Sequence, residues 1–354
     1  MGSTQQGTTK RDRLVHLVGS FPAESTAEAM ETLIDRAGGR LRTLPTGEVR
    51  RYELYIQPII EDLVAQGVLE VRRPGVWRTS RSRPLHRVRR GVELNGTAMD
   101  LGYLHEAEQA APLFERLRAE RELSGVTLQL GMPTPFTMAF IALGPAGVPR
   151  YRSAFAAATV REIAGIRALL GDGVVIQLEA TAELVLSALT QPLHRAAEAA
   201  LELGRGIADL AAASPPGTRF GVHLCLGSMG NKARTAMRTA QPLVDLANSV
   251  ARHWPSDRPL EYVHGPLAAG DIPPPRRAGF YAPLGELSLG PETAFYAGFV
   301  HDEPSSAQQV QTLRMIECAL GARVGGVASA CGLGRRPRAV AEAMVTRAAE
   351  LAAD

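Results

Sequence analysis

The sequence is poor in cysteine, lysine and aromatic residues, and it has no long uninterrupted hydrophobic run. Its 354 residues include three cysteines, and 5% of them are Phe, Trp or Tyr. Because three is an odd number and the cysteines are widely spaced, a disulfide framework is disfavoured and a reducing compartment is expected, with the cytoplasm as the default. The absence of an apolar run of membrane-spanning length argues against a transmembrane segment.

Charge and length narrow the possible classes further. The net charge is +3, and almost all of the positive charge is arginine, because lysine occurs only at Lys10 and Lys232. Residues 1–12 are polar and lack the apolar core of a signal peptide, so we expect a flexible leader. Residues 13–354 are expected to form one globular barrel domain, since the chain is 45% hydrophobic with a mean hydropathy of −0.04 and has the length of one elaborated α/β barrel.

Short apolar strands alternate with helical patterns along most of the chain. The strands are expected to end near residues 18, 44, 130, 178, 225, 263, 300 and 328, and most are followed by a helix. This alternation is typical of a parallel sheet, and about eight repeats favour a closed barrel. We therefore predict an α/β fold, a single (β/α)8 TIM barrel.

Residues 71–94 interrupt this alternation with an arginine-rich segment. Eight arginines lie between residues 72 and 90, spaced by a few apolar residues. We interpret the segment as an inserted hairpin laid over the barrel. Its arginines would form a solvated face or contact an anionic substrate or another subunit, whereas nucleic acid is disfavoured because Trp77 is the only aromatic residue among them.

Residues 219–232 contain the first candidate metal ligands. Residues 220–226 have the apolar pattern of a buried strand, and residues two apart on a strand face the same side, so His223 and Cys225 should point together. Gly227 ends the strand, which places the pair at a carboxyl end, where α/β folds have their active sites. The alternative interpretation is an ordinary core histidine and core cysteine.

Other polar residues follow the remaining predicted strands, and the barrel would bring them to the same rim. They are Gly19, Ser20, Glu48, Glu179, Glu261, His301 and Cys331. Nitrogen and sulfur donors suit zinc, which His223, Cys225 and Cys331 could bind with Glu261 as an exchangeable fourth ligand. His264 competes with Glu261 for that place.

The expected chemistry is attack of sulfur on carbon, because a thiol bound to zinc is deprotonated at neutral pH. His301, which would titrate near neutrality, is the candidate proton donor to the leaving group. The backbone amides of Gly19 and Ser20, together with the carboxylates of Glu48 and Glu179, would bind a polar or amino-bearing substrate.

The ordered set of strand-end motifs resembles a known family. The motifs are Gly19-Ser20-Phe21-Pro22, Gly47-Glu48, Ile176-Gln177-Leu178-Glu179, His223-Leu224-Cys225, Glu261, Gly298-Phe299-Val300-His301 and Cys331-Gly332-Leu333. Together they resemble the C-terminal barrel of cobalamin-independent methionine synthase and its stand-alone relatives, which include the zinc enzyme that adds coenzyme M to epoxides. The resemblance implies the same zinc ligands, homocysteine-type contacts in the first three motifs and a proton-donating His301.

The sequence also departs from that family. It has one barrel where methionine synthase has two, Glu179 stands where the family has Asp, and no residues match the folate site. We therefore predict a zinc-dependent methyl or alkyl transferase acting on a small-molecule thiol, with the donor open and a folate among the candidates. A homo-oligomer is compatible with the sequence.

Two alternatives remain at this point. A metal-free barrel similar to uroporphyrinogen decarboxylase would use arginines to bind substrate carboxylates. A non-catalytic barrel would bind a ligand or partner protein through the face formed by residues 72–90. Metal content separates the first alternative from the zinc enzyme.

Overall fold

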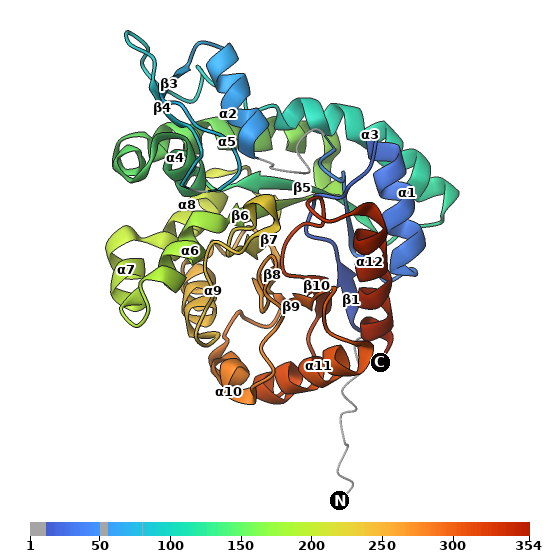
Figure 1. Cartoon of the computed structure of the whole chain (residues 1–354). Helices are drawn as coiled ribbons and strands as arrows, with labels where there is room; N and C mark the ends of the chain where they lie inside the picture. The colour runs from blue at the N-terminus through green and yellow to red at the C-terminus, as the bar shows by residue number, and fades with distance from the viewer. Residues whose placement is uncertain (1–11, 50–55, 80) are drawn as a thin grey trace, which may run out of the picture.

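Eight parallel strands form the centre of the molecule. The computed structural model describes residues 12–49, 56–79 and 81–354. The strands lie in the order β1-β10-β9-β8-β7-β6-β5-β2, with helices around them (Figure 1). Their bounds are β1 (Leu14–His16), β2 (Thr43–Pro45), β5 (Thr127–Pro133), β6 (Val174–Ala180), β7 (Arg219–Leu224), β8 (Leu260–Pro266), β9 (Ala294–Val300) and β10 (Gly326–Ser329).

The two edges of this sheet meet. Every neighbouring pair in the sheet is parallel, and a parallel bridge joins Val15 of β1 to Leu41, just before β2. The Val15 amide also donates a hydrogen bond to the carbonyl of Arg40 at 2.9 Å. The sheet is therefore a TIM-like barrel, and the eight strands predicted from the sequence are confirmed. Their carboxyl ends share one rim.

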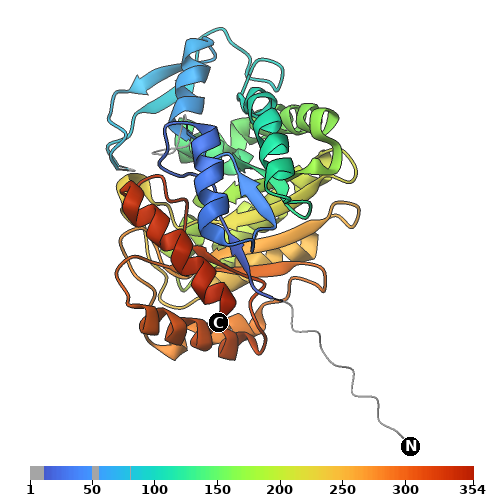
Figure 2. The same ribbon diagram turned by 90° about the vertical axis from the view of Figure 1, so that its right-hand side faces the viewer.

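Helices follow most of the strands and cover the barrel (Figures 1 and 2). They are α1 (Thr26–Ala37), α2 (Ile56–Ala65), α3 (Tyr103–Glu120), α4 (Pro135–Leu143), α5 (Val148–Leu170), α6 (Thr181–Leu189), α7 (His194–Leu201), α8 (Leu203–Ala213), α9 (Gln241–His253), α10 (Ala278–Tyr281), α11 (Ser306–Leu320) and α12 (Arg338–Ala353). Across the described ranges, no helix combines the length and the apolar character that a membrane crossing requires.

Two helices differ from what the sequence pattern indicates. The sequence pattern did not indicate α4, because its residues are almost uniformly apolar and show no helical period. The sequence pattern indicates a helix over residues 234–251, whereas α9 begins only at Gln241, where Pro242 occupies the first turn. Residues 225–240 instead form a long loop that follows β7 and borders the candidate site.

Polar side chains fill the interior of the barrel. The Tyr262 hydroxyl of β8 donates towards the amide oxygens of Gln129 and Gln177, each at 3.2 Å, on strands β5 and β6. The ring of His16 packs against Tyr262 and Tyr296, with ring centroids 4.7 and 4.9 Å apart. This buried layer joins strands that are not neighbours in the sheet.

The arginine-rich insertion is a hairpin, as predicted. Its strands β3 (Leu69–Arg73) and β4 (Leu85–Val88) are antiparallel, and they stand with α2 at one side of the barrel (Figure 1). The buried Arg83 guanidinium donates hydrogen bonds to the carbonyls of Phe140, at 3.2 Å, and Ile141, both in the last turn of α4. The Phe140 carbonyl also accepts a hydrogen bond of 3.1 Å from the amide of Gly144. Arg83 adds a charged donor at this end of α4, where a cation is favourable, and it fastens the hairpin to the barrel.

Candidate metal centre

His223, Cys225 and Cys331 lie together at the carboxyl rim of the barrel. One ligand atom from each lies within 4.8 Å of the others. Strand β7 supplies His223, the residue after β7 supplies Cys225, and the loop after β10 supplies Cys331. The two sulfur atoms are 3.6 Å apart, close to the roughly 3.8 Å between two sulfurs that bind one tetrahedral zinc ion at 2.3 Å.

Hydrogen bonds fix the orientation of the His223 ring. His264 Nε2 lies 3.0 Å from the carbonyl oxygen of Ser329, which only accepts, so Nε2 carries the proton and Nδ1 of His264 is an acceptor. His223 Nδ1, 2.7 Å from that atom, must then donate to it. The Nε2 atom of His223 is left as a buried lone pair, and it has no hydrogen-bond partner in the described chain.

The two cysteines differ in their hydrogen bonds and in the direction of their pKa shifts. Cys331 Sγ accepts hydrogen bonds from Ser228 Oγ at 3.1 Å and from Arg335 Nη2 at 3.2 Å. A hydrogen bond from Cys225 and the nearby Arg335 guanidinium lower the pKa of Cys331, whereas the same hydrogen bond and burial raise the pKa of Cys225. The donors around Cys331 therefore favour its thiolate form, which is the form that binds a metal ion.

This donor set fits a metal ion. An unpartnered imidazole nitrogen faces two sulfurs, one of which accepts two side-chain hydrogen bonds, and nitrogen with sulfur is the combination that zinc prefers. Three protein ligands leave a fourth position for an exchangeable group, which is the arrangement of catalytic rather than structural zinc sites.

Two carboxylates lie on the other side of the same cavity. A methyl group placed on Gly131 would lie 2.6 Å from Glu179 Oε1 and 2.9 Å from Glu48 Oε1, so both carboxylates converge on this glycine. Glu48 follows Gly47 in the left-handed backbone region, with φ of 50°, a strained conformation for a residue with a side chain. The strain indicates that the loop after β2 is held to present Glu48 to the cavity.

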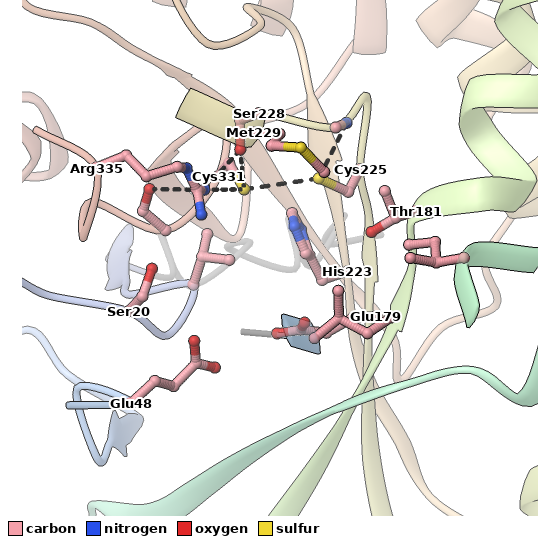
Figure 3. Close-up of a pocket in the computed structure, with 15 residues that line it drawn as sticks. Ser20, Glu48, Glu179, Thr181, His223, Cys225, Ser228, Met229, Cys331 and Arg335 are labelled. Carbon is pink, nitrogen blue, oxygen red and sulfur yellow. Dashed lines mark hydrogen bonds between the residues drawn. The ribbon is translucent and has the colours of Figure 1, made fainter. Parts of the chain in front are cut away.

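The cavity between these groups has a volume of about 80 Å³. Figure 3 shows Glu48 and Glu179 on one side of His223, with Cys225, Cys331 and Arg335 on the other. Ser20 also lines it, and the Ser20 carbonyl accepts a hydrogen bond of 2.8 Å from the amide of Leu333, which ties the loop after β1 to the loop that bears Cys331. Gly19 packs against the Glu48 carboxylate.

His301 lies beside the cluster in a separate small cavity that it shares with Cys331. Its Nε2 donates to the carbonyl of Gly270 at 3.1 Å, and its Nδ1 accepts from the amide of Glu303 at 3.2 Å. Burial, together with the nearby Arg336, lowers its pKa. The role of His301 as a proton donor stays a prediction.

The structure corrects the placement of Glu261. This residue is the second of β8 and pairs with Arg219, the first residue of β7, so it lies at the amino end of the barrel. The sequence interpretation ended this strand near residue 263, whereas β8 continues to Pro266. His264 is the strand partner of His223, but both ring nitrogens of His264 already have hydrogen-bond partners. Neither Glu261 nor His264 belongs to the three-residue cluster.

Two residues of the site were not identified from the sequence. Ser228 and Arg335 both contact the Cys331 sulfur. The only sequence signal for either is its position in a loop directly after a predicted strand, and many residues share that property. Their contact depends on two loops that lie 107 positions apart in the chain.

Fold and cluster together define a class, a TIM-like barrel with three residues at its carboxyl rim that can hold a metal ion. No family model matches the sequence, and no curated protein matches it either. Solved structures do match. A B12-independent methionine synthase from Shewanella sp. W3-18-1, in complex with selenomethionine, is 15% identical, with a TM-score of 0.59 over 96% of this chain and 97% of that one.

Two further structures cover nearly the whole chain. A protein from Listeria monocytogenes assigned as a vitamin-B12-independent methionine synthase is 9% identical, with a TM-score of 0.54 over 97% of this chain and 98% of that one. A methyltransferase from Methanosarcina mazei is 13% identical, with a TM-score of 0.48 over 96% and 94%. The two methionine synthase structures, with TM-scores above 0.5, confirm the fold expected from the family resemblance; at these identities the match concerns the fold alone.

Proposed function

We propose that this protein is a zinc-dependent transferase that moves a methyl or alkyl group to the sulfur of a small thiol. The observation that carries the proposal is the convergence of the unpartnered His223 Nε2 with the sulfurs of Cys225 and Cys331. The methionine synthase fold supports it, since those enzymes are named for forming a methyl thioether. Bound zinc would supply Lewis acidity that keeps the substrate thiol deprotonated at neutral pH.

The carboxylates indicate what else the thiol substrate carries. Glu48 and Glu179 are buried, at 6% and 5% exposure, and they converge on one glycine in the cavity that contains the cluster. Two carboxylates in one buried cavity favour a cation between them. An ammonium group on the thiol substrate would be attracted to this pair and would orient its sulfur towards Cys225 and Cys331.

The transfer itself balances as a displacement. The substrate sulfur attacks the donor carbon, a sulfur–carbon bond forms, and the bond from that carbon to its leaving atom breaks. The leaving atom keeps the electron pair and takes a proton. In this proposal the proton comes from the protonated form of His301, which then returns to neutral imidazole; the Asp302 carboxylate, 3.1 Å from Nδ1, would stabilise the protonated form.

Metal content is the direct test. The purified protein should contain close to one zinc per chain, and Cys225→Ser or Cys331→Ser should reduce this to a trace. Cys318→Ser is the matched control, because Cys318 is exposed and lies outside the cluster. Turnover by a metal-free Cys331→Ser variant would refute the mechanism. His301→Asn should keep its zinc and slow the chemical step.

A second experiment tests the ammonium site without knowledge of the natural substrate. Cysteamine and 2-mercaptoethanol are both small thiols, but only cysteamine carries an ammonium group. Added to cobalt-substituted protein, both should shift the absorption spectrum as sulfur binds, and cysteamine should bind at least tenfold more tightly. Glu179→Gln should abolish this preference. Equal affinities in the unmodified protein would exclude the ammonium site.

A further inference from the structure

A second cavity opens beside the one that contains the cluster. Its volume is about 470 Å³, larger than the first. The two share four lining residues, so they are contiguous. The shared residues are Ile141, Thr181, Gly227 and Met229. The second cavity therefore borders the one in which Cys225 lies.

The charges around the second cavity all have the same sign. Arg81, Arg83, Lys232 and Arg234 line it, and no Asp or Glu is among its described lining residues. Two of these cations have other roles, since Arg83 caps α4 and Lys232 forms an ion pair of 2.8 Å with Asp271.

The remaining two cations are available to a ligand. Arg81 comes from the hairpin and Arg234 from the loop after β7; both are exposed. Within residues 12–49, 56–79 and 81–354, neither guanidinium forms a recorded hydrogen bond or ion pair with an acidic side chain. Both arginines line one cavity, so they raise its positive potential, and an anionic ligand there would be stabilised by both.

The rest of the lining is apolar. Phe140, Val185 and Met229 form much of it, with Ala182 and Ala233 leaving space between them. Apolar walls with a few charged groups at the edge are typical of sites for small organic ligands. The body of the ligand would therefore be apolar, and its charge would lie at the end nearest the arginines.

We propose that this second cavity binds the group donor of the reaction, and that the donor is an anionic molecule, a carboxylate, sulfonate or phosphate, with an apolar body. The anionic end would lie between Arg81 and Arg234, and the apolar body would extend past Met229 towards the cluster. This assignment rests on the proposed function for its role as donor site. The binding preference itself follows from the cavity and does not require metal.

The test uses two fluorescent probes of similar shape. 8-Anilinonaphthalene-1-sulfonate carries an anionic group on an apolar body, and N-phenyl-1-naphthylamine has the same rings without the charge. The unmodified protein should bind the sulfonate at least tenfold more tightly than the neutral probe. In the Arg81→Gln/Arg234→Gln double variant, affinity for the sulfonate should fall at least tenfold and that for the neutral probe less than twofold.

Two further variants test whether sulfonate binding depends on this cavity or only on the positive charge of the protein surface. Arg72→Gln removes an exposed arginine of the same hairpin that does not line the cavity, and it should change sulfonate affinity less than twofold. Ala233→Trp narrows the cavity and should weaken both probes. Unchanged sulfonate affinity in the double variant, or in a folded Ala233→Trp protein, would overturn the proposal.

The outcome is independent of the metal. The Cys331→Ser variant should bind the sulfonate probe as the unmodified protein does. If zinc is absent and the charge preference is present, the proposed function fails and the anion site stands. If zinc is present and the probes bind equally, the anion site fails and the metal mechanism stands.

Discussion

His264 should control how tightly the cluster holds metal, although it is not a ligand in this structure. It is fully buried, and its Nδ1 accepts the proton of His223 Nδ1 at 2.7 Å. That hydrogen bond keeps the lone pair of His223 on Nε2, facing the sulfurs. Removing the acceptor allows the other tautomer and a rotated ring, and loss of such a partner typically costs 10- to 100-fold in metal affinity, about 1.4 to 2.8 kcal/mol.

A pair of variants of similar size tests this reasoning. His264→Asn can place its amide oxygen where Nδ1 stood, whereas His264→Leu cannot accept a hydrogen bond. Zinc affinity is measured by competition with a chromophoric chelator at fixed pH, and thermal unfolding of the metal-free proteins controls for folding. We expect the Leu variant to lose 10- to 100-fold in affinity and the Asn variant to recover most of it.

Two results would refute the argument. Equal zinc affinity in the Leu variant and the unmodified protein would show that the hydrogen bond has no influence. Equal losses in both variants, with a changed cobalt spectrum, would show instead that His264 is itself a ligand, which would require its ring to leave the Ser329 carbonyl.

Three further predictions concern the carboxylates, the barrel interior and the hairpin. Gly131→Ala would place a methyl group against both carboxylates, so cysteamine affinity should fall at least tenfold, while Gly125→Ala, which meets no atom within 4 Å, should not change it. Burial lowers the pKa of His16 from 6.5 to about 3. Below pH 6.5 the unfolded chain therefore binds a proton at His16 that the folded protein does not bind. The free energy of unfolding of metal-free protein should decrease as the pH falls below 6.5, and His16→Phe should reduce the slope of that free energy against pH by about 1.4 kcal/mol per pH unit. Arg83→Gln should lose about 1 to 3 kcal/mol of stability, because buried carbonyls lose a charged donor, and should speed proteolysis of the hairpin, whereas Arg72→Gln should do neither.

The barrel was predictable because its strands are apolar and regularly spaced. Val174 to Leu178 is a continuous buried run after a Gly-Asp-Gly turn, and its strand is β6. By contrast, α4 could not be predicted, because it is apolar on all sides and lies between elements that cover it. Its burial comes from the hairpin and neighbouring helices, which are distant features that a local pattern does not contain.

The site was only partly predictable for a similar reason. His223 and Cys225 share a face because they are two residues apart on one strand, which a sequence shows directly. The pairing of His223 with His264 depends on the register of two strands. A small error in the predicted end of β8 placed Glu261 at the rim of the barrel. Arg335 reaches Cys331 through a loop conformation, which no periodic pattern specifies.

The ligand positions also have a mechanical consequence. Cys225 and Cys331 are separated by 106 residues, so an ion bound by both would cross-link two segments of the barrel that are far apart in the sequence. A fragment with only one of these two cysteines would lack the complete set of ligands. Because the unfolded chain loses this geometry, saturation at a thousand times the dissociation constant should add about 4 kcal/mol to the free energy of unfolding. The thermal unfolding temperature would then measure how much of the site is occupied by metal, without knowledge of the substrate.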